Sequence, residues 1–396
     1  MTRGLQKVDL THVRRGSSEL ARDINRDIVF EVVRANQPVS RANIARLTGL
    51  QASTVSSIVD QLISERWVRE SGISRSQTHG RPPTMVTLND SLAALAVDIH
   101  PRRATLAVVD LNGRFLSQAQ IAVTSSPRKT VANIVQTAMR MKKDLPRHVI
   151  EGIGIALPGR VDPKTGRLRF APNLGWDNFD IKRAVEQGTG MIVEMDNEAN
   201  ACLLAEMWFG HMDGVRNAVL ITISEGIGAA ILSNGELIYG KNNMAGELGH
   251  VPLDVNGPEC HCGGRGCWEM YASSNAALNF YREGKPKAPA GTIEELLHLV
   301  SQGDRSAIKA VTRQAEYVGK GLSLISRTLA PQVILIAGDI VAIWQHVAPA
   351  IAKSFMAKAL PADLRPRVVP AHQANLRGAA ILVLRRHVNP GDKTTP

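Results

Sequence analysis

Three cysteines and a histidine make the densest group of metal-ligand side chains in this sequence. Cys260, Cys262 and Cys267 fall within eight residues, and His250 lies ten residues before the first of them. Four thiolate and imidazole donors suit a closed tetrahedral zinc site. The glycines among the cysteines allow a turn tight enough for the sulfurs to reach one ion. Because four protein ligands leave no coordination position open, we expect this knuckle, residues 250–267, to hold a structural Zn²⁺.

Two other roles for the cysteines compete with metal binding: they could be buried without a ligand in a glycine-rich loop, or they could form a disulfide. Only one other cysteine, Cys202, occurs in the chain. The N-terminal segment is polar and basic and lacks the apolar core of an export signal, and no apolar run reaches membrane-spanning length. We therefore expect a cytoplasmic protein with no membrane partner. In that reducing compartment, clustered cysteines bind metal more often than they form disulfides.

The charge of the chain is positive and unevenly distributed. Its 396 residues include 47 Lys and Arg against 36 Asp and Glu, a formal net charge of +11. Residues 1–85 hold 13 of these basic residues and 8 of the acidic ones, so their density of net positive charge is about three times that of the remaining chain. Hydrophobic residues make up 44% of the sequence, enough for two or three packed cores. The basic first segment favours a polyanionic partner.

Three helices are predicted in this first segment. The first covers residues 24–36, Ser40 is the expected N-cap of a second that ends near Gly49, and a third follows from Gln51. The apolar stripes of the first and third helices are Ile24, Ile28, Val29, Val32 and Val33, and Val55, Ile58, Val59 and Leu62. A short helix, a glycine-containing turn and a helix with small polar residues at its start predict a helix-turn-helix DNA-binding unit.

Two short strands around a basic loop are expected next, from Val68 and over Met85–Leu88, and together they would form a wing. The alternative is a three-helix scaffold with an ordinary surface loop. Residues 21–88 are thus a predicted winged helix-turn-helix domain, and residues 1–20 a predicted flexible arm. The side chains expected to contact double-stranded operator DNA are Arg41, Gln51, Ser53, Thr54, Ser56, Ser57, Arg75 and Arg81.

After the wing, the pattern indicates an α/β body, residues 89–396. Strands are expected at Leu92–Ile99, Ala104–Asp110, Phe115–Val123, Val149–Leu157, Met191–Met195, Ala218–Ile223, Ile227–Leu232 and Val333–Ala337. Helices are expected over 127–142, Glu198–Phe209, 304–329 and 340–358. A three-strand meander begins both parts of this pattern, which indicates two related lobes with a cleft between them.

The sequence resembles the ROK family, named for repressors, open reading frames and sugar kinases, over essentially its whole length. The most specific match is Gly246-Glu247-Leu248-Gly249-His250 with the Cys-x-Cys-x4-Cys-Trp-Glu run from Cys260. Supporting matches are Leu157-Pro158-Gly159-Arg160-Val161, Ala171-Pro172-Asn173-Leu174-Gly175-Trp176 and Asp196-Asn197-Glu198-Ala199-Asn200-Ala201. The resemblance implies an α+β winged helix-turn-helix domain followed by an α/β, two-lobed, actin/hexokinase-like (ribonuclease H-like) body.

The resemblance also implies a sugar site beside the knuckle. The residues at the positions that contact sugar hydroxyls in this family are Asn173, Asn197, Glu198, Glu247, His250 and Glu269. Amides and carboxylates are suitable partners for a polyol, and His250 could use one ring nitrogen for zinc and the other for a hydroxyl. The alternative role for the two asparagines is in turns or helix caps.

The chain departs from the kinase pattern at three places. Asp98-Ile99-His100-Pro101-Arg102-Arg103 stands where the kinases have an Asp, two glycines and a hydroxyl residue, and proline has no amide hydrogen for phosphate. Ser224-Glu225-Gly226-Ile227-Gly228 puts a carboxylate in the second phosphate loop. Glu198 replaces the general-base Asp, and its longer side chain would displace the carboxylate. These departures predict that no residue of this chain is catalytic.

We therefore predict a DNA-binding repressor of carbohydrate genes, a homodimer or tetramer, whose operator affinity changes when a sugar or sugar phosphate binds between the lobes. Two alternatives remain open at this point. One is an ATP-dependent, glucokinase-like sugar kinase with an added DNA-binding domain. The other is a regulator that senses metal or thiol chemistry through the knuckle.

Overall fold

The structure, a computed structural model, describes residues 18–73, 83–162, 165–171, 174–177, 179–210, 212, 214–283, 290–356, 361, 364–371 and 374–388. The chain divides into two compact units: the head, which reaches to Leu92 and takes in the chain from Arg385 onward, and the body, Ala93–Leu384. None of the helices in the described ranges combines the length and apolar character needed to cross a membrane.

The head contains the three expected helices. These are α1 (Ser18–Asn36), α2 (Arg41–Thr48) and α3 (Ala52–Ser64). At the start of α2, the Ser40 hydroxyl accepts a hydrogen bond from the backbone N–H of Asn43 at 3.2 Å, so Ser40 is the N-cap, as predicted. At its end, Gly49 has a left-handed backbone with a φ of 71°, which suits a residue without a side chain.

A three-stranded antiparallel sheet completes the head. Its strands are β1 (Val39–Ser40), β2 (Val68–Ile73) and β3 (Thr84–Leu88), in the order β1-β3-β2. The two strands of the expected wing are therefore present. The loop that joins them lies outside the described residues, and so do Arg75 and Arg81.

The head's core is only partly the one expected from helical spacing. Phe30 of α1 packs edge-on against Trp67 with ring centroids 5.6 Å apart, and the predicted stripe of α3 is fully covered. In α1, however, Ile24 and Ile28 are 50% and 42% exposed, whereas Val29 and Phe30 are buried. The buried face of α1 is therefore rotated away from the predicted stripe, because the large Phe30 ring fixes which side contacts the core.

The body begins with a five-stranded sheet in the order β11-β7-β4-β5-β6. Its strands are β4 (Leu92–Ile99), β5 (Arg103–Asp110), β6 (Phe115–Ala122), β7 (Val149–Leu157) and β11 (Val193–Asn197). The helices α4 (Pro127–Asp144) and α5 (Ile181–Thr189) contribute to its core. A small sheet follows β7, formed by β8 (Arg160–Val161), β9 (Leu168–Ala171) and β10 (Trp176–Asp177).

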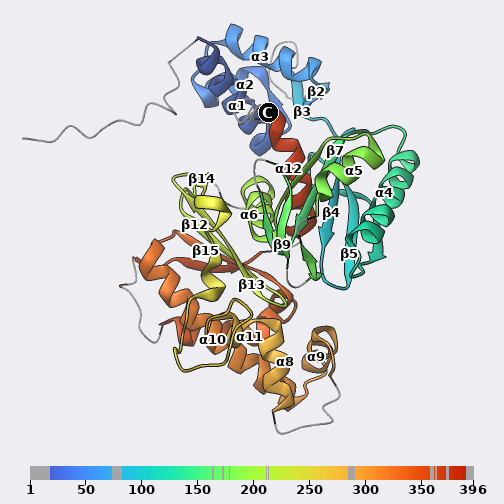
Figure 1. Ribbon diagram of the computed structural model, residues 1–396. Helices are drawn as coiled ribbons and strands as arrows, with labels where there is room; N and C mark the ends of the chain where they lie inside the picture. The colour runs from blue at the N-terminus through green and yellow to red at the C-terminus, as the bar shows by residue number, and fades with distance from the viewer. Residues whose placement is uncertain are drawn as a thin grey trace, which may run out of the picture. The chain divides into compact units, whose positions relative to one another are not determined.

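A second five-stranded sheet has the order β14-β13-β12-β15-β16. Its strands are β12 (Ala218–Ile223), β13 (Ile227–Ser233), β14 (Glu236–Leu237), β15 (Val333–Gly338) and β16 (Arg367–Pro370). The helices of this half include α7 (Glu269–Ala272), α8 (Ser274–Arg282), α9 (Ile293–Ser301), α10 (Arg305–Leu329) and α11 (Trp344–Met356). Figure 1 shows α10 and α11 packed side by side.

The two sheets of the body share one topology. In each, three strands form an antiparallel meander, a fourth strand pairs with the first strand of that meander, and a fifth strand extends the edge beside the fourth. The meanders are β4-β5-β6 and β12-β13-β14, and the added strands are β7 with β11 and β15 with β16. Two copies of the same arrangement are what the repeated strand pattern in the sequence predicted.

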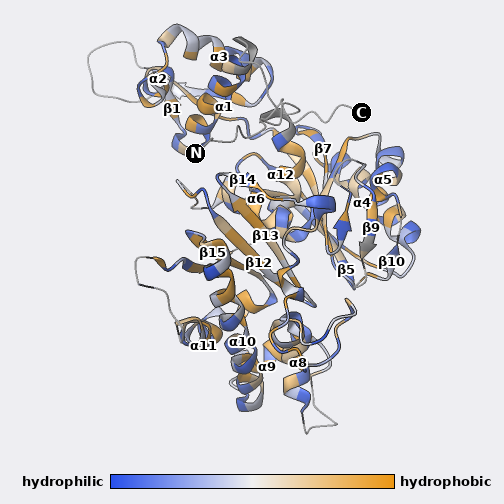
Figure 2. Ribbon diagram, turned by 60° about the vertical axis from the view of Figure 1, so that its left-hand side comes forward, coloured by the Kyte–Doolittle hydropathy of each residue, from blue (hydrophilic) through white to orange (hydrophobic). Residues whose placement is uncertain are grey.

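Both faces of the second sheet are covered. Along β12, Val219, Ile221 and Ile223 belong to the core beneath α10 and α11, whereas Ala218 and Leu220 face the core formed with α6 (Glu198–Phe209). A strand buried on both faces must be apolar throughout, which is why β12 and β13 carry the hydrophobic colour in Figure 2.

Several expected elements differ in their bounds; α1, for example, was expected from residue 24 and begins at Ser18. The strand expected over Met191–Met195 is observed at Val193–Asn197, because it runs on to the residue that caps α6. The helix expected over 340–358 opens with a 3-10 turn, Asp339–Ile343, before α11 starts at Trp344. The helix α12 (Ala374–Val388) was not expected from the sequence.

Candidate functional site

The four predicted metal ligands come together in the knuckle. The donor atoms of His250, Cys260, Cys262 and Cys267 all lie within 4.8 Å of one another. His250 Nδ1 is 3.6 Å from Cys260 Sγ, and the sulfurs of Cys262 and Cys267 are also 3.6 Å apart. In a tetrahedral zinc–thiolate site the sulfurs are about 3.8 Å apart, from a Zn–S distance of about 2.3 Å. The donor set therefore fits a tetrahedral divalent ion.

The local backbone explains how these donors meet. Cys260 N–H donates to Gly264 O and Gly263 N–H donates to Cys260 O, so the chain turns back between the second and third cysteines. At Gly266 the φ is +63°, and a Cβ there would lie 1.5 Å from Asp254 O. Only glycine fits that position. Burial raises the pKa of the Cys267 thiol to about 12, and a bound cation would offset this by holding the thiolate directly.

His250 also connects the knuckle to a carboxylate. It ends the 3-10 turn Glu247–His250, and its Nε2 lies 3.6 Å from Glu247 Oε2. The other oxygen, Glu247 Oε1, accepts a hydrogen bond from Arg160 Nε at 3.0 Å. Arg160 belongs to β8, next to the first five-stranded sheet, and Glu247 follows β14 of the second, so this ion pair joins the two lobes built on these sheets. Sequence reasoning quoted Arg160 in a motif but gave it no role.

Asn197 uses both groups of its side chain within the fold. Its Oδ1 accepts from Ala199 N–H at 2.8 Å, which caps α6, and its Nδ2 donates to Gly159 O at 2.9 Å. The structure thus gives Asn197 the capping role that was the alternative to sugar binding. Its contact with a sugar stays a prediction, and Asn173 lies outside the described residues.

Glu269 binds the turn that joins β12 to β13. Its Oε2 accepts a hydrogen bond from Ile227 N–H at 2.9 Å. The same turn, residues 224–226, is bonded to Glu198 through Ser224 Oγ at 3.4 Å and to Asn275 Nδ2 through Glu225 O at 2.8 Å. The turn is therefore held by α6, α7 and α8 together. This role of Glu269 was not foreseen from the sequence.

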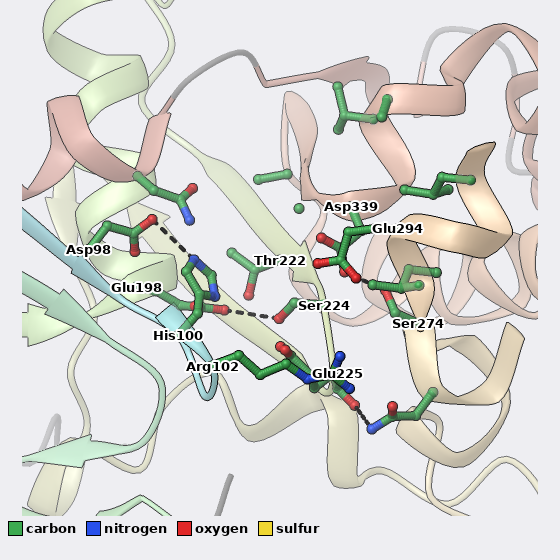
Figure 3. Close-up of a pocket in the computed structure, with 18 of the residues that line it drawn as sticks. Asp98, His100, Arg102, Glu198, Thr222, Ser224, Glu225, Ser274, Glu294 and Asp339 are labelled. Carbon is green, nitrogen blue, oxygen red and sulfur yellow. Dashed lines mark hydrogen bonds and ion pairs between the residues drawn. The ribbon is translucent and has the colours of Figure 1, made fainter. Parts of the chain in front are cut away.

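Glu198 lines a cavity of about 680 Å³ in the body, shown in Figure 3. Its side chain is 5% exposed, and burial raises its pKa. The segment from Asp98 and the segment at Ser224, where the sequence predicts altered phosphate loops, both contribute to the wall of this cavity. Sequence reasoning did not foresee Glu294 and Asp339, two further carboxylates of the lining, because they come from α9 and from the turn after β15, far along the chain from Asp98 and Glu198.

His100 is paired inside the cavity. Its Nε2 lies 3.0 Å from Asp98 Oδ2. Burial disfavours the charged imidazole, but the Asp98 carboxylate outweighs that effect and raises the pKa of His100 to about 10. The cavity wall therefore holds a largely buried ion pair between β4 and the residue that follows it.

The predicted DNA contacts on α3 lie on its outer face. Gln51, Ser53 and Ser57 are exposed, and Thr54 and Ser56 are half-buried, while the opposite side of the helix packs into the head. The N-cap residue, Gln51, makes no side-chain hydrogen bond to the first turn. Backbone N–H groups at a helix start are suited to bind phosphate.

Arg41 is engaged within the head. Its Nη2 lies 2.7 Å from Asp60 Oδ1 and 3.0 Å from Glu70 Oε1, and its Nη1 donates to Ser56 O at 3.2 Å. The Asp60 hydrogen bond raises the pKa of the guanidinium further. Arg41 thus ties α2 to α3 and β2, and its DNA contact stays a prediction.

Comparison with known proteins gives a family match and several regulators. A profile described as the ROK family matches residues 94–386. The chain is 33% identical over 322 residues to the xylose repressor of Bacillus subtilis (strain 168), covering 80% of this chain and 83% of that protein. It is 27% identical to the DNA-binding transcriptional dual regulator NagC of Escherichia coli (strain K12), covering 94% and 95% of the two chains.

Solved structures with the same fold include a regulator and a kinase. A ROK family transcriptional regulator, a homologue of the E. coli MLC protein, matches with a TM-score of 0.77 and 25% identity over 93% of this chain and 97% of its own. A ROK family glucokinase from Streptomyces griseus, in complex with glucose and AMPPNP, matches with a TM-score of 0.67 and 29% identity over 73% and 98%. These matches confirm the fold class expected from the sequence, and only the regulator extends over nearly all of this chain.

Proposed function

Because the chain belongs to the ROK family and adds a helix-turn-helix head to the family's body, we propose that it is a sugar-responsive, DNA-binding transcriptional repressor. The observation that carries this proposal is the extent of the likeness. NagC and the MLC homologue match 93% or more of the chain, head included, and the xylose repressor matches 80%, whereas the glucokinase matches 73% of it. A head of this kind serves DNA recognition, and sugar phosphorylation has no need of it.

In the proposed complex, α3 lies in the major groove of operator DNA. Gln51, Ser53 and Ser57 face outward at its start, where short polar side chains reach base edges and phosphates. Thr54 and Ser56 stand beside them. Arg75 and Arg81, in the wing, would add contacts to phosphate or to the minor groove. A homodimer or tetramer would set two heads on a two-fold related operator.

The proposed sugar site lies where the two lobes are joined. Three side-chain contacts cross between them near the knuckle: Arg160 with Glu247 at 3.0 Å, Asn243 Nδ2 with Val161 O at 3.1 Å, and Tyr239 OH with Asp196 Oδ2 at 3.1 Å. A sugar that engages Asn173, Asn197, Glu198, Glu247, His250 and Glu269 would compete with or reinforce these contacts and so favour one lobe angle. Only a difference in affinity for the two lobe arrangements can change DNA binding.

The knuckle would hold a structural Zn²⁺ through His250, Cys260, Cys262 and Cys267. When bound, the ion supplies a fixed positive centre and no catalytic position. Its effect on the sugar would pass through His250, whose second nitrogen faces Glu247. Changing Cys260 or Cys262 to Ser tests this, and a metal-free variant with a full sugar response would contradict it.

We propose that this chain does not catalyse phosphoryl transfer. Glu225 adds a carboxylate to the cavity wall, and carboxylates repel phosphate, while Pro101 has no amide hydrogen to donate to it. A coupled assay with ATP and a sugar panel tests this statement, and turnover above background would show that the chain is a kinase.

We also propose that the protein acts in the cytoplasm, because clustered thiols that bind metal are typical of a reducing compartment.

The experiment that tests the proposed function is fluorescence anisotropy with labelled DNA from upstream of the protein's own coding sequence. D-xylose, D-glucose, N-acetyl-D-glucosamine and the corresponding sugar phosphates are added in turn at fixed salt, since phosphate contacts make affinity strongly dependent on ionic strength. Tight binding that shifts with one sugar supports the proposal. Binding that ignores every sugar but responds to a chelator or an oxidant favours a metal or thiol switch, and no binding at all refutes the repressor.

A matched pair of variants locates the DNA contact. Ser53→Ala at the start of α3 should weaken operator binding by about tenfold, the loss expected for one polar base contact. Ser64→Ala, at the other end of the same helix, is the control and should bind as the unaltered protein does. Equal effects of the two changes would place the groove contact elsewhere.

A further inference from the structure

The cavity in Figure 3 lies where three strands of the body end. Asp98 stands near the end of β4, Thr222 near the end of β12, and Gly338 at the end of β15. One part of its wall is apolar and comes from α8, α9 and the turn before α11. The apolar side chains of that part are Leu278, Ile293, Leu297, Val341 and Ala342. The cavity wall thus combines apolar side chains with polar ones, as small-molecule sites do.

The lining of the cavity carries an excess of negative charge. Five carboxylates line the cavity against three cationic side chains, including His100. Asp98 pairs with His100 at 3.0 Å, and Glu294 pairs with Arg103 at 3.7 Å. When these two ion pairs are left out of the charge balance, three carboxylates remain in the lining, Glu198, Glu225 and Asp339, with one basic side chain, Arg102.

Two buried carboxylate oxygens of the cavity lining lack hydrogen-bond donors. Among the described residues, neither Asp98 Oδ1 nor Glu198 Oε2 has a hydrogen-bond partner. Both side chains are more than nine-tenths buried, at 7% and 5% exposure, and both line the cavity. Buried acceptors without donors are costly, so they favour a ligand that brings N–H groups to them.

We propose that this cavity is a second ligand site and that it binds an organic cation, an amine with an apolar portion. The ammonium group donates to the buried oxygens of Asp98 and Glu198, and its charge is balanced by the unpaired carboxylates. The apolar portion lies against Leu278, Ile293 and Leu297. The site shares Glu198 with the proposed sugar contacts, whereas Asn197, Glu247, His250 and Glu269 do not line it, and the proposal holds whether or not the chain represses transcription.

Isothermal titration calorimetry on the full-length protein, without DNA or sugar, tests the proposal at fixed low salt. The probes are benzylamine, its neutral counterpart benzyl alcohol, spermidine and Mg-ATP. We expect saturable binding of the amines at one site, with benzyl alcohol weaker by about tenfold or more, the loss of one charge-assisted contact. Benzyl alcohol binding as tightly as benzylamine, or Mg-ATP binding more tightly than either amine, would overturn it.

Two conservative variants place the binding in this cavity. Glu225→Gln and Asp339→Asn each remove one unpaired charge and keep hydrogen-bonding capacity, and Ser274 Oγ, 2.8 Å from Asp339 Oδ2, can bond to either form. Each should weaken benzylamine binding by about tenfold. Glu236→Gln, on the exposed β14 outside the lining, is the matched control and should leave it unchanged.

Unaltered amine affinity in both cavity variants would place the amine elsewhere and refute the assignment. If either variant fails to fold by circular dichroism, the comparison of benzylamine with benzyl alcohol on the unaltered protein decides the outcome. That comparison requires no substitution.

Discussion

The substitution Gly321→Ala, in α10 rather than in the knuckle itself, should disturb the knuckle. Gly321 lies in the middle of α10, and a Cβ there would lie 2.0 Å from Trp268 Cε2 and 2.2 Å from Cζ2. Trp268 is 2% exposed, and its indole N–H donates to Tyr317 O at 2.9 Å. Its two chain neighbours are Cys267, a proposed metal donor, and Glu269, which bonds to the first residue after the β12–β13 turn. Displacing the indole therefore shifts both.

The magnitude of Gly321→Ala follows from opposing terms in the free energy of unfolding. Alanine favours a helix interior over glycine by about 1 kcal/mol. Overpacking a core costs typically about 1–3 kcal/mol, and contacts as short as these belong at the upper end. Loss of the indole hydrogen bond adds about 1 kcal/mol. The packing terms win, so we expect a net destabilisation of about 3 kcal/mol, or roughly 6 °C in Tm for a unit of this size.

Thermal and urea unfolding of the full-length protein measure this change. Gly291→Ala is the matched control, because the nearest atom to an added Cβ there is Glu295 Oε2 at 3.4 Å, an ordinary contact. We expect Gly291→Ala to unfold as the unaltered protein does, and Gly321→Ala also to show a reduced metal content and a weaker sugar response. If Gly321→Ala were as stable as the control, the packing argument that links α10 to the knuckle would be wrong.

Three further changes test other parts of the structure. Cys262→Ser should lower the zinc content of the purified protein, measured by elemental analysis, and lower its Tm, because three donors bind the ion less tightly than four. Ser40→Ala removes the bond to Asn43 N–H and should destabilise the head by about 1 kcal/mol, measured by urea unfolding, with weaker operator binding. His100→Gln should remove stability that depends on pH. The folded-state pKa of His100 is raised to about 10 by Asp98, so its contribution is complete below the unfolded-state pKa of about 6.5 and disappears as the pH rises through 10.

Each of these three expectations can fail clearly. Full zinc occupancy and an unchanged Tm in Cys262→Ser would remove that thiol from the ligand set. A urea midpoint for Ser40→Ala equal to that of Ser64→Ala would mean that the cap contributes nothing. A stability difference between His100→Gln and the unaltered protein that stays constant from pH 6 to pH 10, rather than shrinking, would contradict the ion pair with Asp98.

Local sequence features, each spanning a few residues, predicted much of the fold. The Ser40 cap, the Gly49 end and the bounds of β4, β7, β12 and α6 follow from propensity and pattern within one segment. The knuckle could also be foreseen, since its three cysteines are neighbours in the chain. Repetition of the strand pattern predicted the two lobes before any topology was known.

Contacts between distant segments could not be predicted in this way. Arg160 and Glu247 are 87 residues apart, and nothing in either segment signals that they meet. The bond from Ile227 N–H to Glu269 depends on how α7 packs on the second sheet. The exposed Ile24 and Ile28 show the same limit, since helical spacing gives a stripe but the neighbours decide which side is covered.

The turn between β12 and β13 constrains which substitutions the protein can accept during evolution. Ser224 and Glu225 line the cavity, while the next strand residue, Ile227, is bonded to Glu269 beside the knuckle. A substitution in this turn acts on two recognition events at once, so variation there is pleiotropic. Laboratory selection for a new effector should therefore recover paired substitutions, one in the turn and one in α7 or α8. Libraries that randomise the turn alone should yield few functional proteins.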